Sequence, residues 1–150
     1  MKYKLTGLII ALAVLSLSAC SLFGDNNDPF FDLREQIRAT VHDQEHAEAM
    51  VASIDRLDQL LLESAELLSS IARQERLLFY DYDSSPEDFE SLFSEGARKR
   101  QELQDEMLDV HLEFKASATA EEWEVILPVH AAAVSSRVQT LVVAAADERR

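Results

Sequence analysis

The longest regular pattern in the sequence runs through residues 44–82, where apolar residues recur at alternating steps of four and three with no glycine or proline between them. We call such a row of side chains a seam, and here it consists of Met50, Ile54, Leu57, Leu61, Leu68, Ile71, Leu78 and Tyr82. A seam of this length predicts one helix about 57 Å long at 1.5 Å per residue, packed lengthwise against another helix. The chain is therefore expected to fold through helix packing.

A second long helix is expected directly after the first. Residues 84–88 supply a serine for the N-cap, a proline for the first helical position and acids that complement the helix dipole. The seam of this helix consists of Phe89, Phe93, Gly96, Leu103, Met107, Val110 and Phe114. Because the linker between the two helices is short, we expect them to run antiparallel.

The last helix is expected to begin at a capping box. The side chain of Thr119 would bond the amide of residue 122 while Glu122 reaches back to the amide of residue 119. The helix then continues to the carboxyl end. Pro128 lies inside it, which removes one backbone hydrogen bond and predicts a kink near Leu127.

Residues 33–41 indicate a short additional helix before the long ones. The polar residues 42–45 that follow fit either a bend or a frayed continuation of that helix. The predicted fold is all-α: an elongated, coiled-coil-like antiparallel three-helix bundle with a short extra N-terminal helix. It would form one domain over residues 33–150.

The amino terminus has the order of a secretory signal. Lys2 and Lys4 precede an apolar run over residues 5–17, and small residues follow in Leu-Ser-Ala-Cys at residues 17–20. The apolar run is too short to span a bilayer as a helix, which needs about 20 apolar residues. We therefore expect the segment to be removed after export.

The Leu-Ser-Ala-Cys sequence resembles the lipobox of bacterial lipoproteins, in which the cysteine thiol receives a diacylglycerol, cleavage follows and the new amino group is acylated. The resemblance covers residues 1–20 and implies a signal peptide over residues 1–19 and a lipid on Cys20. Residues 21–29 contain turn formers without a sustained period, so a tether is expected, which together with the lipidated cysteine occupies residues 20–32. Ser21 stands where an aspartate would resemble the family's inner-membrane retention signal. The implied address is the periplasmic face of the outer membrane, and the alternative is an ordinary cleaved signal.

The composition restricts the partners and the chemistry of the exported chain. Cys20 is the only cysteine, so no intramolecular disulfide can form. Removing Lys2 and Lys4 with the signal leaves 12 basic against 28 acidic residues, a net charge of −16. Nucleic acid and anionic lipid surfaces are therefore poor partners. The sequence has no glycine-rich phosphate loop and no nucleophile paired with a base, so we expect no enzyme and no cofactor besides the lipid on Cys20.

His42 and His46 lie four residues apart, which would place both imidazoles on one helical face at a spacing that can hold a metal ion. Asp43 stands where the metalloprotease motif needs glutamate, so hydrolysis at this pair is not expected. A structural or sensing site would need two more ligands from the fold. The candidates are Glu63, Met107 and His111. The competing interpretation is two solvated histidines at a helix junction.

Two further groups of residues have a structural and a functional interpretation. His111 and His130 lie on or beside apolar rows, and each is expected to be half-buried against a carboxylate. Residues 79–83 combine aromatic rings with carboxylates, which predicts a plug that closes the end of the core or, alternatively, a recognition tip.

The segment Ala-Thr-Ala-Glu-Glu-Trp at residues 118–123 resembles the Leu-Thr-x-x-Gln element of small periplasmic helical stress and heavy-metal sensor proteins. Here Ala118 replaces the leucine and Glu122 the glutamine. The resemblance implies an all-helical fold, a periplasmic location and binding of metal or misfolded protein.

The last helix carries more apolar residues than one buried stripe requires. We expect the surplus to be covered by the short first helix or to bind a protein partner or a second copy, whereas Arg137 and Gln139 oppose membrane insertion. The partner-binding candidates are Val138, Leu141, Val142 and Val143. The sequence thus favours a non-enzymatic lipid-anchored adaptor or scaffold, and the alternative is a metal-responsive periplasmic sensor that uses His42 and His46.

Overall fold

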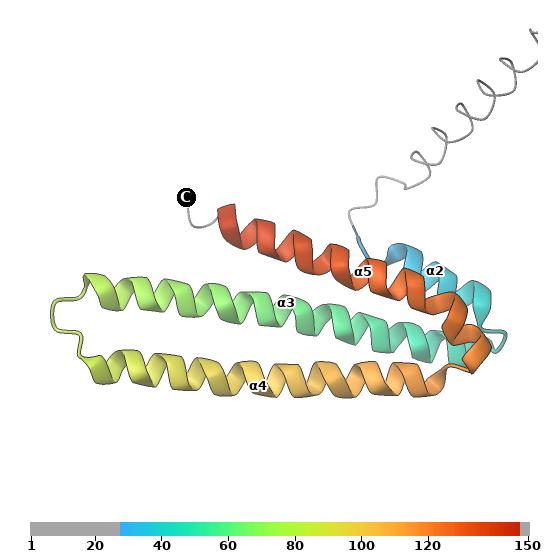
Figure 1. The fold of residues 1–150 in the computed structure, drawn as a ribbon, viewed down its shortest axis with the longest axis horizontal. Coiled ribbons are helices and arrows are strands. Elements are labelled where there is room, and N and C mark those ends of the chain that lie inside the picture. Colours follow the sequence, from blue (N-terminus) through green and yellow to red (C-terminus); the bar gives the residue numbers. More distant parts are fainter. Residues whose placement is uncertain (1–27, 148–150) are drawn as a thin grey trace, which may run out of the picture.

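The computed structural model describes residues 28–147, and within them the side chains of residues 28–144. This part of the chain is entirely helical apart from its turns, which confirms the predicted fold class (Figure 1). The elements in order are α2 (Phe31–Thr40), α3 (Gln44–Tyr80), α4 (Pro86–Ser117) and α5 (Ala120–Asp147). The three long helices alternate in direction, and the short α2 precedes them, as predicted.

Helices α3 and α4 form a long antiparallel hairpin whose seams largely follow the predicted pattern. Met50, Ile54 and Leu57 are buried on α3, and Gly96 and Phe114 are buried on α4. A Cβ atom at position 96 would lie 2.5 Å from the Cδ1 atom of Ile71. The glycine therefore lets the two helices approach closely at this point.

Three residues predicted to lie in the seams are exposed instead. Leu68 is 50% exposed, Phe93 46% and Tyr82 100%. Tyr82 lies beyond the end of α3. Leu67 and Leu92, which directly precede Leu68 and Phe93 in the sequence, are half-buried in their place. A straight helix has 3.6 residues per turn, so a row spaced at 3.5 drifts by about 20° per heptad and leaves the contact face.

The main core lies where α2 and α5 cover one half of α3. Phe30, Leu33 and Ile37 are fully buried around α2, and Ile126 and Ala133 are buried on α5. The packed domain thus begins by Phe30, before the boundary at residue 33 expected from the sequence. The tether expected over residues 20–32 includes residues 28–32, which belong to the domain.

The helix ends follow the sequence signals. Asp43 caps α3 by accepting a hydrogen bond from the amide of His46 at 2.8 Å, so the chain between α2 and α3 is a bend and not a frayed helix. Ser85 and Asp88 form a capping box at α4, and Thr119 and Glu122 form the predicted one at α5. The backbone hydrogen bond from Thr119 lowers the pKa of the Glu122 carboxyl.

Helix α5 continues through Pro128 and bends near its start in Figure 1. It runs in the same direction as α3, and Arg137 reaches Asp58. Asp147, the last residue of α5, follows Arg137 by ten residues, and Leu68 of α3 follows Asp58 by ten residues. Because both helices rise 1.5 Å per residue, α5 ends about level with Leu68. The rest of the hairpin projects beyond α5, as Figure 1 shows. The domain therefore has a four-helix body and a two-helix extension.

Leu57→Ala and Leu68→Ala separate these two environments. Leu57 is 6% exposed and Leu68 is 50% exposed, although both belong to the seam predicted from the sequence. We expect Leu57→Ala to lower the free energy of unfolding by about 2 to 5 kcal/mol, because it leaves a cavity, and Leu68→Ala to cost less than about 1 kcal/mol. Urea unfolding followed by circular dichroism measures both. Equal losses would contradict the boundary between body and extension.

Candidate functional site

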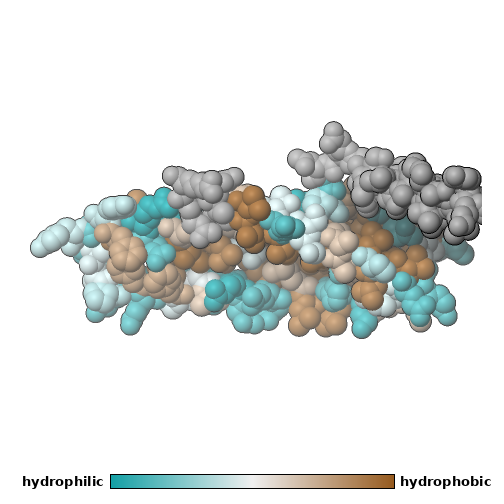
Figure 2. Space-filling view, turned by 45° about the horizontal axis from the view of Figure 1, so that its top comes forward, coloured by the Kyte–Doolittle hydropathy of each residue, from teal (hydrophilic) through white to brown (hydrophobic). Residues whose placement is uncertain are grey.

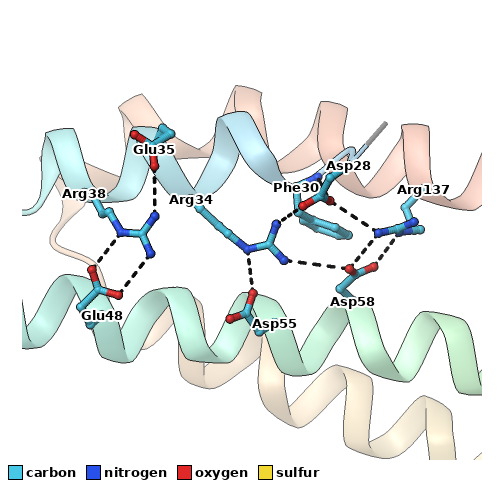
Figure 3. Close-up of polar contacts among 9 residues, drawn as sticks. All are labelled: Asp28, Phe30, Arg34, Glu35, Arg38, Glu48, Asp55, Asp58 and Arg137. Carbon is cyan, nitrogen blue, oxygen red and sulfur yellow. Dashed lines mark hydrogen bonds and ion pairs between the residues drawn. The ribbon is translucent and has the colours of Figure 1, made fainter. Parts of the chain in front are cut away.

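Five charged side chains join α2, α3, α5 and the segment before α2 (Figure 3). Arg34 donates from Nε to Oδ1 of Asp55 at 2.7 Å and from Nη1 to Oδ2 of Asp28 at 2.5 Å. Arg137 donates from Nη2 to Oδ2 of Asp58 at 2.8 Å. Its Nε also lies 2.6 Å from Oδ1 of Asp58, as an ion pair at an angle outside the range of hydrogen bonds. Longer contacts link Arg34 to Asp58 at 4.0 Å and Arg137 to Asp28 at 3.6 Å.

The centre of this ion cluster is shielded from water. The side chains of Arg137 and Asp58 are 15% and 14% exposed, and the guanidinium of Arg137 lies 5.8 Å from the centre of the Phe30 ring. Shielding two charges costs desolvation free energy, which their pairing offsets, and removing one partner leaves the other charge uncompensated. The pair therefore positions α5 on α3 more than it adds net stability.

Sequence reasoning missed this cluster. Arg137 is the only Asp, Glu, Lys or Arg between Glu124 and Asp147 of α5, and Arg34 lies directly beside the buried Leu33 on α2. A lone cation in a long helical stretch without other charges, or one beside a buried apolar residue, indicates that an acidic partner lies opposite. The sequence alone does not identify Asp58 as that partner, because Asp58 lies 79 positions before Arg137.

Arg137→Ala tests how far the shielded pair fixes α5. We expect it to lower the free energy of unfolding by about 3 kcal/mol, because Asp58 then keeps a shielded and poorly compensated charge. Arg38→Ala is the matched control, since the side chains of Arg38 and of its partners Glu35 and Glu48 are exposed at 41%, 58% and 51%, and it should change stability by less than about 1 kcal/mol. Urea unfolding compares the two variants, and similar losses would refute the role of shielding.

The two histidines predicted as metal ligands have different surroundings. His42 is exposed, whereas His46 is half-buried and its Nε2 donates a hydrogen bond to the carbonyl oxygen of Ser117 at 2.7 Å. This bond joins the start of α3 to the end of α4. Within the described residues, no three His, Cys, Asp or Glu side chains gather so as to hold a metal ion. The structure thus brings no third ligand of these types to His42 and His46 and gives His46 a structural contact.

His111 and His130 meet where α4 contacts α5, with their ring centres 5.2 Å apart. His130 is 6% exposed, stacks on Phe114 at 5.5 Å and lies 6.1 Å from Trp123. Its Nε2 has no hydrogen-bond partner among the described residues. The carboxylate expected beside His130 is therefore wrong, because aromatic rings surround it instead. Burial, and secondly the neighbouring His111, lowers the pKa of His130.

This lowered pKa makes stability depend on pH. Between the ordinary value of 6.5 and the pKa in the folded state, the unfolded chain binds a proton at His130 and the folded chain does not, so stability falls as the pH falls. His130→Phe keeps an aromatic ring beside Phe114 and removes this proton. We expect the variant to lose less stability than the wild type on acidification from about pH 7.5 to 5.5, with a difference of up to about 1.4 kcal/mol per pH unit. Urea unfolding at both pH values measures this, and parallel losses in both proteins would contradict it.

The carboxyl-terminal half of α5 presents apolar side chains to solvent. Val138, Val142 and Val143 are 42%, 61% and 57% exposed, and Leu141 is half-buried. We call these four residues the α5 face. Figure 2 shows that hydrophobic side chains also reach the surface at other places along the molecule, between hydrophilic ones.

Among the described residues, one helical stretch, Ala120–Ala144, is long and apolar enough to cross a membrane by length and composition, and 17% of the tested window is buried. Arg137 belongs to this stretch and pairs with Asp58 of α3. The pair holds the middle of α5 against the body, so the exposed apolar side chains of this stretch lie on the surface of a packed domain.

The aromatic residues at the end of the hairpin do not close the core. Phe79 is 70% exposed, Tyr80 85% and Tyr82 100%. Phe79 makes an edge contact with Phe89, with ring centres 5.1 Å apart. The predicted plug is therefore wrong, because neither α2 nor α5 reaches this end and there is little core to close.

Comparison of the chain with protein-family models, with curated proteins and with solved structures found no match.

Proposed function

We propose that this protein is a non-enzymatic adaptor or scaffold, anchored by a lipid on Cys20 to the periplasmic face of the outer membrane, which binds a periplasmic protein partner through the α5 face. The observation that carries the proposal is the exposure of Val138, Val142 and Val143 on a helix that is held to the body by a shielded ion pair. Apolar side chains that are clustered, exposed and fixed in position are typical of a protein interface.

The distance between the proposed anchor and the domain supports this role. Asp28 follows Cys20 by eight positions in the sequence, and at about 3.5 Å per residue this part of the chain reaches at most about 28 Å when extended. Asp28 itself contacts Arg34 and Arg137. A domain held in this way would stay close to the membrane, where its partner would be captured.

A protein partner fits the α5 face better than the membrane does. Insertion of α5 into lipid would separate Arg137 from Asp58 and leave a cation in the hydrocarbon region, which costs about 3 kcal/mol or more. The net charge of the mature chain is also strongly negative, so anionic lipid would repel it.

One experiment in the producing bacterium tests both halves of the proposal. A photoreactive amino acid replaces Leu141, and cross-linked products are compared in membrane and soluble fractions. We expect a discrete heteromeric product in the membrane fraction, retained with Leu112→Glu on the exposed side of α4 and lost with Val142→Glu, because a charge on the α5 face is not tolerated in an apolar interface.

Cys20→Ser should move the protein to the soluble fraction if the cysteine carries the anchor. If this variant remains with membranes, the anchor is wrong. A cross-linked product unaffected by Val142→Glu, or no heteromeric product at all, would reject the α5 face as the partner site.

A further inference from the structure

The two-helix extension has a groove along one face, lined only by residues of α3 and α4. It consists of two adjoining hollows that share Gln74, Leu92 and Glu95, so the groove is continuous. Its apolar lining residues are Leu67, Ile71, Leu77, Leu78 and Leu92. Leu77 remains 70% exposed. Two helices alone cannot cover this row, whereas the packing of two such pairs into a four-helix bundle can.

Charged residues border the groove in a fixed order. On α3, the basic Arg73 precedes Leu77 by four residues, and the acidic Asp81, which directly follows the helix, comes four residues after Leu77. All three are exposed. At 1.5 Å per residue, Arg73 lies about 6 Å along the helix from Leu77 toward the body, and Asp81 lies just past the end of the helix on the tip side. In the described part of the chain, neither Arg73 nor Asp81 belongs to an ion pair, whereas the groove residue Lys99 pairs with Glu95.

Helix α4 repeats this order around its own apolar residue. The acidic Glu87 lies five residues before Leu92 and the basic Arg98 lies six residues after it, with both charges exposed. In the part of the chain that the structure describes, Arg98 forms one ion pair, with Glu102 on the same helix and in an exposed position. Each helix of the extension therefore carries an acid toward the tip, a leucine in the middle and a base toward the body.

We propose that the groove binds the same groove of a second copy of this chain, in an antiparallel two-fold arrangement. The two-fold axis crosses the helices at Leu77 and Leu92, so each leucine packs near its own counterpart. Turning one extension end over end places Arg73 opposite Asp81 of the other copy, and Glu87 opposite Arg98 of the other copy. The result is a four-helix bundle at the centre of an elongated dimer.

A second copy is the occupant that this charge order favours. A two-fold interface requires that each surface complement itself, and an acid and a base placed at similar distances on either side of an apolar centre meet that requirement. A parallel arrangement of two copies would set acid against acid and base against base. This inference goes beyond the adaptor proposal, because it uses a surface that does not include the α5 face.

Charge exchange on the full-length chain in detergent micelles tests the arrangement by sedimentation equilibrium. Arg73→Glu and Asp81→Arg should each raise the dissociation constant of the dimer by about tenfold or more, because each places like charges opposite one another twice. Combining both changes in one chain should restore the dimer, and mixing the two single variants should give a heterodimer. Lys115→Glu and Asp109→Arg make the same charge changes at exposed sites of α4 outside the groove and should leave the constant unchanged.

Leu77→Cys tests the position of the axis. In the Cys20→Ala background the introduced thiol is the only one, and we expect mild oxidation to link two copies through it within the preformed dimer. Leu108→Cys is the matched control, since Leu108 is 55% exposed on α4 away from the groove. A wild-type chain that stays monomeric at all concentrations would overturn the proposal. So would reversals no more harmful than their controls, or equal linking at the two thiol positions.

Discussion

The ion pair between Arg137 and Asp58 determines how the rest of this fold fits together. Helix α5 is apolar around much of its circumference, so hydrophobic burial alone would let it rotate or slide against α3 at little cost. A shielded charge pair has one favourable geometry and a high cost for any other. The neighbouring Arg34 and Asp28 extend the same constraint to α2 and to the chain before it. Register in the body is thus set by charges, and its stability comes from the apolar core around them.

How much of this structure the sequence predicts depends on the range of the interaction. Capping by Ser85 and Thr119 is local, and the seams of α3 and α4 are periodic, so helices, their order and their directions were predictable. The predicted burial of Leu68 and Phe93 was wrong, because their exposure depends on where a third helix ends and on the drift of the seam around a straight helix. The predicted carboxylate beside His130 was wrong for a related reason. Its aromatic neighbours come from two helices, and no local pattern brings them together.

The division into a four-helix body and a two-helix extension explains where the candidate binding surfaces occur. In the body, the short α2 covers only part of the apolar circumference of α5, which leaves Val142 and Val143 exposed. In the extension, neither α2 nor α5 is present, which leaves Leu77 exposed beside the groove. Both surfaces therefore result from unequal helix lengths. Neither is marked by an unusual residue, so motif analysis has little to detect at either place.

The entry of the chain into the domain has a mechanical consequence. Asp28 bonds Arg34 of α2 and lies 3.6 Å from Arg137 of α5, and Phe30, two residues later, is fully buried. Tension applied to the preceding chain would reach this point before any helix, and it would have to break charged contacts and withdraw an aromatic ring together before α2 could unwind. The first residues of the domain would thus resist such tension at the edge of the fold, before α2 unwinds.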